Sequence, residues 1–312
     1  MSTKQQLTLK HFHPKLWLTW LGFGCWRLIV FLPYPVITWL GRQLGLMLYS
    51  RGGYRHEIAR VNLRLCFPDM TESDRRQLLR DNFISYGIAF FEVGIGWWWS
   101  PSRLEKITNV KGLEHIDALK GQGALLMAIH FTTIEVGASG LSVRRSIDGM
   151  YRPHKNIVYD FIQRRGRLSK SLEAEVYTRN DVRGILKALR KGKVIWYAPD
   201  QDYGPKQSVF SDFFGIKAAS VTATAKFAKV GDALVLPFSH VRLANNKGYS
   251  ITIHPPLENF PCEDEASNAG IINKMIEGMI LEQPEQYLWA HRRFKTRPEG
   301  EPRLYPKKNK RR

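Results

Sequence analysis

The spacing of hydrophobic positions changes near residue 100. Before this point apolar residues recur at three- and four-residue steps, as in residues 78–90, which give one apolar helical face. Beyond it, short apolar runs rich in β-branched and aromatic residues alternate with helical patterns. The change predicts a helical N-terminal region followed by an α/β region.

Strand-like runs and helical patterns alternate through this second region. The predicted strands are residues 124–129, 149–152, 175–178, 194–198, 234–238 and 249–254. The predicted helices are residues 132–143, 157–169, 181–191, 220–230 and 266–282. Strand–helix alternation with short connections is typical of an α/β fold with a largely parallel, helix-covered sheet.

Two apolar stretches precede the α/β region. Residues 16–32 are almost continuously apolar, with Arg27 as the one charge, and a Pro-Tyr-Pro break separates them from the apolar residues 36–49. The first stretch is just long enough to cross a hydrocarbon core, but a mid-segment arginine opposes insertion. The stretches therefore predict either one membrane-spanning helix or a helical hairpin lying in the membrane interface. The lysines at positions 4, 10 and 15 favour the hairpin, and a buried helix of a soluble protein is the third alternative.

The net charge is strongly positive. The 312 residues carry a net charge of +19, of which residues 292–312 contribute ten Lys or Arg against two Glu. This excess indicates an anionic partner, which is nucleic acid, an acidic carrier protein or an anionic membrane. The three cysteines are widely spaced, which excludes a disulfide framework and a recognisable zinc site. We divide the chain into an N-terminal membrane-associated segment (1–50), a main domain (51–305) and a basic tail (306–312).

His130 and Glu135 are the first candidates for catalysis. His130 ends the predicted strand 124–129, and Glu135 lies in the first turn of the helix that follows. A carboxylate bonded to one ring nitrogen fixes the tautomer of a histidine and leaves its other nitrogen free as a general base. The pair predicts proton abstraction from a hydroxyl group. Thr132-x-x-Glu135 is also a capping box, so Glu135 is equally explained as a helix cap.

The wider chain resembles a known family. The spacing H-x-x-x-x-E after an apolar strand is similar to the motif of glycerolipid-type acyltransferases. More specific blocks, in the same order, are similar to the late acyltransferases of lipid A biosynthesis, of the lauroyl and palmitoleoyl type. The blocks are HPKLWLTW (13–20), LPYPV (32–36), NLRLCFP (62–68), YRP (151–153), YAPDQDYGP (197–205), PEQYLW (284–289) and HRRFKTRP (291–298).

The resemblance implies a fold and a reaction. It implies a sheet of the glycerolipid-acyltransferase type and makes residues 51–305 an acyltransferase domain. It implies transfer of a fatty acyl chain from an acyl carrier protein to a hydroxyl on an acyl chain of Kdo-bearing lipid IV(A), an anionic glycolipid. The location implied is the cytoplasmic face of the inner membrane of a Gram-negative cell. No metal or other cofactor is expected, because the donor carries its own phosphopantetheine, and nucleic acid is not an expected partner.

Six further residues are candidates for substrate binding. They are Arg152, Asp200, Asp202, Tyr203, Arg292 and Arg293. The arginines are suited to binding phosphates or carboxylates through two hydrogen bonds, although an ion pair or solvated tail charge also explains them. The two aspartates and the tyrosine follow the strand 194–198 in a turn rich in Pro and Gly, where we expect them to orient substrate or an arginine.

Two rival functions use the same observations. A phospholipid acyltransferase acting on glycerol phosphate or lysophosphatidate has the same chemistry, but residues 197–205 lack the phosphate motif F-P-E-G-T-R-S expected of it. A membrane-tethered nucleic-acid-binding protein is suggested by the charge alone, with no zinc-finger spacing or helix-turn-helix pattern to support it.

Overall fold

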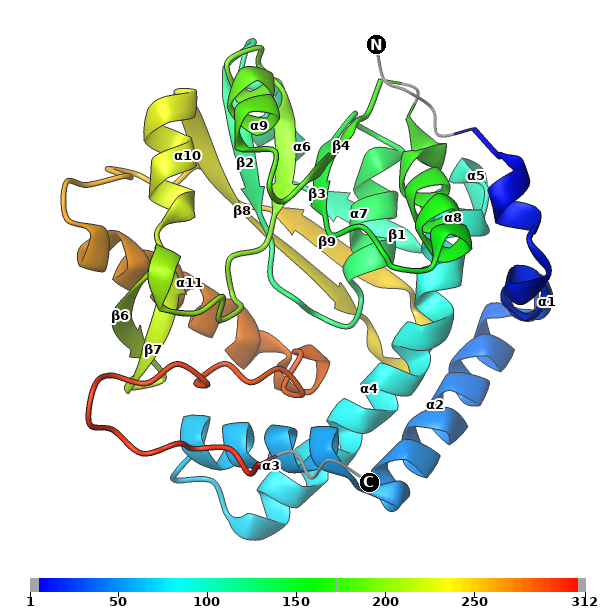
Figure 1. Ribbon diagram of the computed structural model, residues 1–312, viewed down its shortest axis with the longest axis horizontal. Coiled ribbons are helices and arrows are strands. Elements are labelled where there is room, and N and C mark those ends of the chain that lie inside the picture. The colour runs from blue at the N-terminus through cyan, green and yellow to red at the C-terminus, as the bar shows by residue number, and fades with distance from the viewer. Residues whose placement is uncertain (1–5, 172, 308–312) are drawn as a thin grey trace.

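The computed structural model describes residues 6–171 and 173–307. Of the predicted basic tail, residues 306–307 fall within this range, whereas 308–312 lie outside the described residues, as do residues 1–5 of the predicted N-terminal segment. The described chain forms one central sheet with helices on both faces and a helical N-terminal region along one side (Figure 1).

The central sheet has seven strands in the order β1-β9-β8-β2-β5-β3-β4. All neighbouring strands run parallel except β8 and β9. This confirms the α/β class with a mostly parallel sheet. The strands are β1 (Thr108–Lys111), β2 (Gly123–Met127), β3 (Asp148–Tyr151), β4 (Val176–Thr178), β5 (Val194–Tyr197), β8 (Ala233–Arg242) and β9 (Tyr249–Ile253).

All six predicted strands belong to this sheet. The edge strand β1 and a separate antiparallel hairpin, β6 (Ser208–Phe213) and β7 (Ile216–Val221), were not predicted. The hairpin also corrects one helix boundary: the helix expected over residues 220–230 begins only after β7, because residues 220 and 221 pair with β6. The alternation of apolar and polar residues in strands this short is difficult to recognise next to a helical pattern.

Helices precede the sheet and connect its strands. Those of the N-terminal region are α1 (Trp17–Ile29), α2 (Tyr34–Arg51), α3 (Tyr54–Cys66), α4 (Glu72–Trp98) and α5 (Pro101–Glu105). Those among and after the strands are α6 (Leu113–Asp117), α7 (Ile134–Ser142), α8 (Ile157–Arg167), α9 (Val182–Leu189), α10 (Ala223–Gly231) and α11 (Glu265–Glu282).

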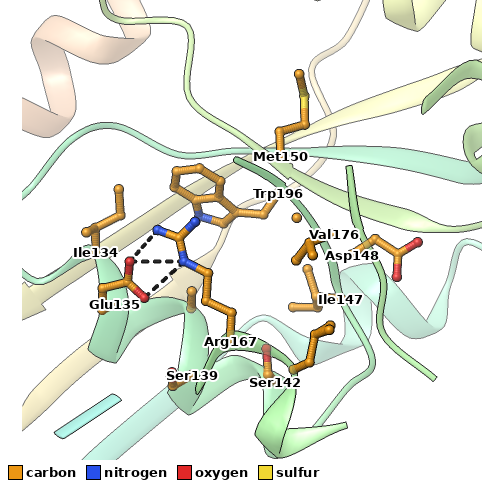
Figure 2. A pocket seen from close by; sticks show the side chains of 13 residues that line it. Ile134, Glu135, Ser139, Ser142, Ile147, Asp148, Met150, Arg167, Val176 and Trp196 are labelled. Carbon is orange, nitrogen blue, oxygen red and sulfur yellow. Dashed lines mark hydrogen bonds and ion pairs between the residues drawn. The ribbon is translucent and has the colours of Figure 1, made fainter. Parts of the chain in front are cut away.

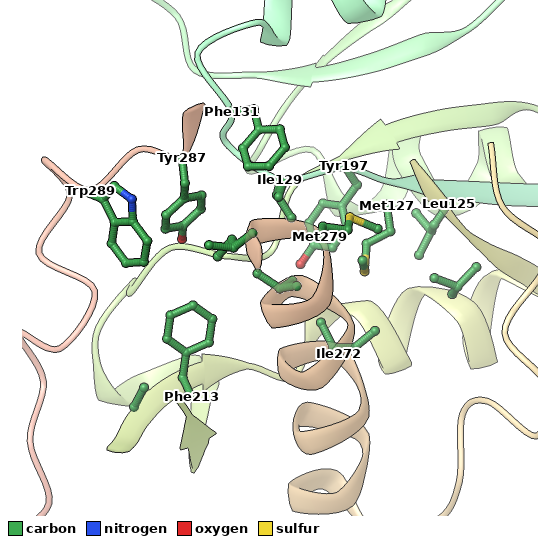
Figure 3. Close-up of a cluster of buried hydrophobic side chains, with 14 of the residues drawn as sticks. Leu125, Met127, Ile129, Phe131, Tyr197, Phe213, Ile272, Met279, Tyr287 and Trp289 are labelled. Carbon is green, nitrogen blue, oxygen red and sulfur yellow. The ribbon is translucent and has the colours of Figure 1, made fainter. Parts of the chain in front are cut away.

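Strand β2 lies at the centre of the core. All five of its residues are buried, and alternate side chains point to opposite faces of the sheet. Leu125 and Met127 pack, together with Ile129 just after the strand, into a cluster formed with α3, α9, α10 and α11 (Figure 3). Ala124 and Leu126 pack on the other face with residues of α6 and α7. A strand buried on both faces reads as a continuous apolar run, which is why the sequence reveals it clearly.

Helices α2 and α4 pack against each other at backbone distance. A Cβ atom placed on Gly87 of α4 would lie 2.1 Å from the Gly41 carbonyl oxygen and 2.3 Å from the Gly45 nitrogen of α2. Figure 1 shows α2 running alongside the long α4. Because the contact is formed by glycines, any side chain at these positions would separate the two helices.

The N-terminal apolar stretches form short helices. Among the described residues, no helix combines the length and the apolar character needed to cross a membrane. The first stretch divides into α1, of 13 residues, and a turn before Pro33. The outer face of α1 exposes Leu18, Leu21 and Leu28.

We predict that Gly87→Ala destabilises the protein. The added methyl group would meet backbone atoms of α2, which cannot rotate away, so the loss should reach about 1–3 kcal/mol, the usual cost of overpacking. Gly278→Ala on α11 is the matched control: a Cβ there has no neighbour within 4 Å, and the change should stabilise by about 0.4–1 kcal/mol. Thermal unfolding of both variants checks the difference; equal melting temperatures would contradict the close contact.

Candidate active site

The centre of the site is a hydrogen-bonded pair, His130 and Asp200. Strands β2 and β5 are adjacent and parallel, with Met127 opposite Tyr197. His130 and Asp200 each lie three residues beyond these positions, so the register brings them together at the carboxyl edge of the sheet. The His130 Nδ1 and Asp200 Oδ1 atoms are 2.6 Å apart, and the His130 backbone N–H donates to Asp200 Oδ2 at 3.0 Å.

The pairing fixes the tautomer of His130. An ionised carboxylate only accepts hydrogen bonds, so Nδ1 carries the proton and Nε2 of the neutral ring keeps a free lone pair. The Asp200 side chain is 1% exposed and that of His130 is 24% exposed. Burial raises the pKa of Asp200, but the charge and hydrogen bonds of His130 outweigh it and lower the pKa to about 2. The carboxylate therefore stays charged, and the imidazole remains within reach of a substrate.

The C-terminal segment holds the loops that carry the pair. The Leu288 backbone N–H donates to the His130 carbonyl oxygen at 3.0 Å. The Asp202 carboxylate accepts from the backbone N–H groups of Gly204 and Thr296, each at 2.8 Å, and from the Thr296 hydroxyl at 2.9 Å. Asp202 is 2% exposed. It was predicted to contact substrate, but its carboxylate instead joins the loop after β5 to the C-terminal segment.

Glu135 does not bond His130 as the sequence led us to expect. Its carboxylate forms an ion pair with the Arg167 guanidinium (Figure 2). It also accepts the Trp97 indole N–H at 2.8 Å. The capping box predicted for Thr132 and Glu135 is not formed either: Thr133 is the residue that precedes α7 and its side chain makes no cap hydrogen bond, whereas the Thr132 hydroxyl contacts that of Ser85. His130 is bonded to a carboxylate as expected, but that carboxylate belongs to Asp200, which follows the neighbouring strand β5. Glu135 instead belongs to a buried ion pair beside the site.

The Glu135–Arg167 pair lines a narrow cavity next to α7. Apolar side chains from α7, β3, β4 and β5 form much of its wall, among them Met150, Val176 and Trp196 (Figure 2). Two of its lining residues, Ile134 and Glu135, begin α7 directly after the loop that carries His130. The cavity is therefore a largely apolar space with an ion pair at the end of α7 next to that loop.

The other predicted binding residues lie in three different environments. Arg152 and Tyr203 are exposed at the same edge of the sheet as Asp200. Arg292 is exposed beside Tyr54, the first residue of α3, with 3.4 Å between Nη1 and the hydroxyl oxygen. Arg293 is 2% exposed, and its guanidinium donates to the Ala219 carbonyl oxygen at 2.8 Å. Arg293 was predicted to bind substrate; the structure instead places it in the interior, against the β6–β7 hairpin.

Sequence reasoning missed Arg167 and Trp97 as partners of Glu135. Arg167 ends the basic pattern at the C-terminus of α8, where solvated charge is the ordinary interpretation. Trp97 lies in a run of three tryptophans, which indicates an apolar contact and no particular partner. No group of three or more His, Cys, Asp or Glu among the residues described is arranged to hold a metal ion.

Comparison with known proteins gives consistent matches over the chain. The family described as bacterial lipid A biosynthesis acyltransferase matches residues 5–296. The lipid A biosynthesis lauroyltransferase of Escherichia coli (strain K12) is 44% identical over 296 residues, covering 94% of this chain and 96% of that protein. The palmitoleoyltransferase of the same strain is 41% identical with the same coverage. A lipid A biosynthesis acyltransferase of Haemophilus influenzae is 40% identical over 298 residues, covering 94% of this chain and 95% of that protein.

We predict that Asp200 stabilises the fold above about pH 4 and that this contribution disappears as the pH falls. The pKa of Asp200 is about 2 in the folded chain and about 3.9 in an unfolded chain. A lowered folded pKa gives stability that is complete above the unfolded pKa and is lost on acidification through the folded one. The difference in unfolding free energy between the wild type and Asp200→Asn should therefore shrink by roughly 2 kcal/mol between about pH 5 and about pH 2. Denaturant titrations of both proteins check this; a gap that does not change with pH would contradict the charged pair.

Proposed function

This chain belongs to the family of bacterial lipid A biosynthesis acyltransferases, and from that premise we propose its substrates and its mechanism. It is an acyltransferase of lipid A biosynthesis. We propose that an acyl carrier protein thioester is the donor and that the acceptor is a hydroxyl group on an acyl chain of Kdo-bearing lipid IV(A). The observation that carries the mechanism is the His130–Asp200 pair at the carboxyl edge of the sheet.

In this mechanism His130 is the general base. Its free Nε2 takes the proton from the acceptor hydroxyl, the oxygen attacks the thioester carbonyl carbon, and the carbon–sulfur bond breaks. The thiolate that leaves takes up the proton from the His130 imidazolium, which regenerates the base, and the new ester is the product. The negative Asp200 stabilises the imidazolium that forms on His130. Because the thioester already supplies a good leaving group, the reaction needs no covalent enzyme intermediate and no metal or redox cofactor.

Glu135 and Arg167 act beside this pair. The cavity that they line has apolar walls, which suit the acyl chain of the donor. In our proposal the chain lies between α7 and β3, and the ion pair stands near the carbonyl group. In this proposal Glu135 acts beside the reacting groups as the partner of Arg167 and not as the partner of His130. Arg152 and Tyr203, exposed at the same edge, are available to the polar part of a substrate.

The N-terminal region suits an anionic membrane surface. Residues 1–56 contain no Asp or Glu and carry seven Lys or Arg. Trp17, Leu18 and Leu28 on α1 and Trp39 on α2 are exposed by between 59% and 82%. An apolar helical face bordered by cations is typical of a segment lying in the interface. We propose the hairpin arrangement at the cytoplasmic face of the inner membrane.

The rival functions have less support. Phospholipid acylation would use the same pair of side chains, but the similarity to lipid A acyltransferases extends over 94% of the chain. Nothing in the site is suited to reading nucleic acid, and the positive charge that suggested it is explained by an anionic membrane and a phosphorylated acceptor.

We predict that His130→Ala lowers kcat by about 10²–10⁴-fold, the usual loss when a positioned general base is removed. Asp200→Asn should also lower kcat while changing KM little, because Asp200 acts through His130. The measurement is transfer from acyl carrier protein thioesters to the tetra-acylated acceptor, read by mass spectrometry. A far-UV circular dichroism spectrum and membrane binding like those of the wild type show that His130→Ala is folded, and near-normal turnover of the folded variant would refute the mechanism.

We predict that Leu18→Ser, Leu21→Ser and Leu28→Ser together weaken membrane binding by at least about tenfold. The three side chains share the exposed face of α1, and burying one Leu fully is worth about 1.5–3 kcal/mol. Flotation with vesicles containing anionic phospholipid measures the change. Leu281→Ser on α11 removes an equally apolar side chain, 59% exposed, and should have no effect. A loss as large in this control would show that α1 is not the membrane-binding face.

A further inference from the structure

A second cavity lies where α2 ends and α3 begins, against the C-terminal segment. It encloses about 1130 Å³, its open mouth included. Arg51 and Arg55 line the mouth, and Phe83 and Tyr86 of α4 form one wall. None of the described residues that line it is acidic. The cavity is therefore a partly apolar space with two cations at its opening.

The inner wall of this cavity borders the catalytic pair. It includes Gln201, the residue after Asp200, and Leu288, whose backbone N–H donates to the His130 carbonyl oxygen. It also includes His291, whose Nε2 lies 3.2 Å from the Asp202 backbone nitrogen. Burial lowers the pKa of His291 to about 4, so this part of the wall is neutral at physiological pH. A molecule in the cavity would thus extend from the two arginines toward His130.

The cations at the mouth are available to a ligand. Arg51 is exposed and forms no ion pair with a carboxylate of the described residues. Arg55 uses Nη1 to donate to the Ala290 carbonyl oxygen at 2.8 Å, which leaves the rest of its guanidinium free. Exposed Arg292, of the C-terminal segment, lies beside Tyr54, the residue before Arg55. Because no acidic residue precedes Glu57 in the sequence, the electrostatic potential from these arginines favours an anion. A guanidinium donates several hydrogen bonds at once, so an anion with several acceptor oxygens suits it best.

The outer rim of the cavity is apolar. Leu48 lines the cavity and is 37% exposed, and Met47 beside it is 48% exposed. Leu44 and Leu40, which precede Leu48 at four-residue steps and therefore lie on the same face of α2, are partly exposed. An anion site that continues into an exposed apolar helix suits an amphiphile, with its charged head in the cavity and a hydrocarbon chain along α2.

We propose that this cavity binds a phosphate group of the lipid acceptor, held by Arg51 and Arg55, with one acyl chain of the acceptor lying along α2. The inference rests on the proposed function, since it places the acceptor of that reaction. The phosphopantetheine arm of the donor also carries a phosphate. The apolar path out of the cavity favours the lipid, because a donor arm would lead outward to a hydrophilic carrier protein.

The test is substrate kinetics of full-length Arg51→Gln and Arg55→Gln. Losing a guanidinium–phosphate contact should raise the acceptor KM by about 10–100-fold, the range for hydrogen bonds to charged groups, and leave the donor KM within about threefold. Arg51→Lys keeps the charge but not the two-bond contact, so it should recover part of the loss. Arg183→Gln is the matched control, because it removes an exposed arginine on α9 and should change neither constant.

A binding measurement separates this inference from the proposed function. The full-length His130→Ala protein, which needs no turnover, is titrated with the doubly phosphorylated tetra-acylated disaccharide and with its dephosphorylated form. We expect the phosphorylated form to bind more tightly, and Arg51→Gln in this background to abolish the difference. Equal binding of both forms, or a rise in the donor KM alone, overturns the inference. If the wild type binds the phosphorylated form through Arg51 but transfers no acyl group, the proposed function fails and the phosphate site stands.

Discussion

The site depends on the register between two adjacent parallel strands. Met127 of β2 lies opposite Tyr197 of β5, and both chains continue for three residues before His130 and Asp200 bond each other. A shift by one residue would turn alternate side chains to the other face of the sheet and separate the pair. Because β2 is buried on both faces, the core itself prevents such a shift. The position of the His130–Asp200 pair is thus set by hydrophobic packing on the strands, to which the contacts of the loops are added.

A buried ionic network fixes the loop that follows His130. Arg242, at the end of β8, binds Glu92 of α4 through two hydrogen bonds of 2.6 and 2.7 Å. Its Nη1 also donates to Ser85 of α4, whose hydroxyl lies 2.7 Å from that of Thr132, two residues after His130. Removing one partner of a buried pair typically costs about 3–5 kcal/mol. The long helix α4 therefore helps to position the loop that follows His130. Its close contact with α2 at Gly87 holds α4 itself in place.

The sequence predicted every strand of the central sheet except the edge strand β1, and it singled out His130 but not Asp200, to which His130 is bonded. Buried strands are visible as apolar runs, whereas the order of strands in a sheet depends on crossovers that no local pattern records. Reasoning along the chain therefore chose Glu135, five residues away, over Asp200, seventy residues away. One local signal was present: Asp200, like His130, comes directly after the end of an apolar strand-like run. Arg293 was misinterpreted for a related reason, because an arginine in a basic segment gives no indication that its guanidinium is buried against a hairpin.

The two cavities explain why the site lies between an apolar helical region and the sheet. They share no lining residue, yet each borders a loop of the pair, one through Glu135 and the other through Gln201 and Leu288. A transferase must bring two substrates together at one site at the same time. Both substrates proposed here have a long apolar part and an anionic part. The apolar cavity inside the α/β core suits the single acyl chain that a carrier protein brings. The basic cavity that opens along α2 suits a lipid acceptor that remains partly in the membrane. In the arrangement that we propose, α2 is a wall of the acceptor site as well as part of the membrane anchor, because it contributes to the apolar surface and to the basic mouth.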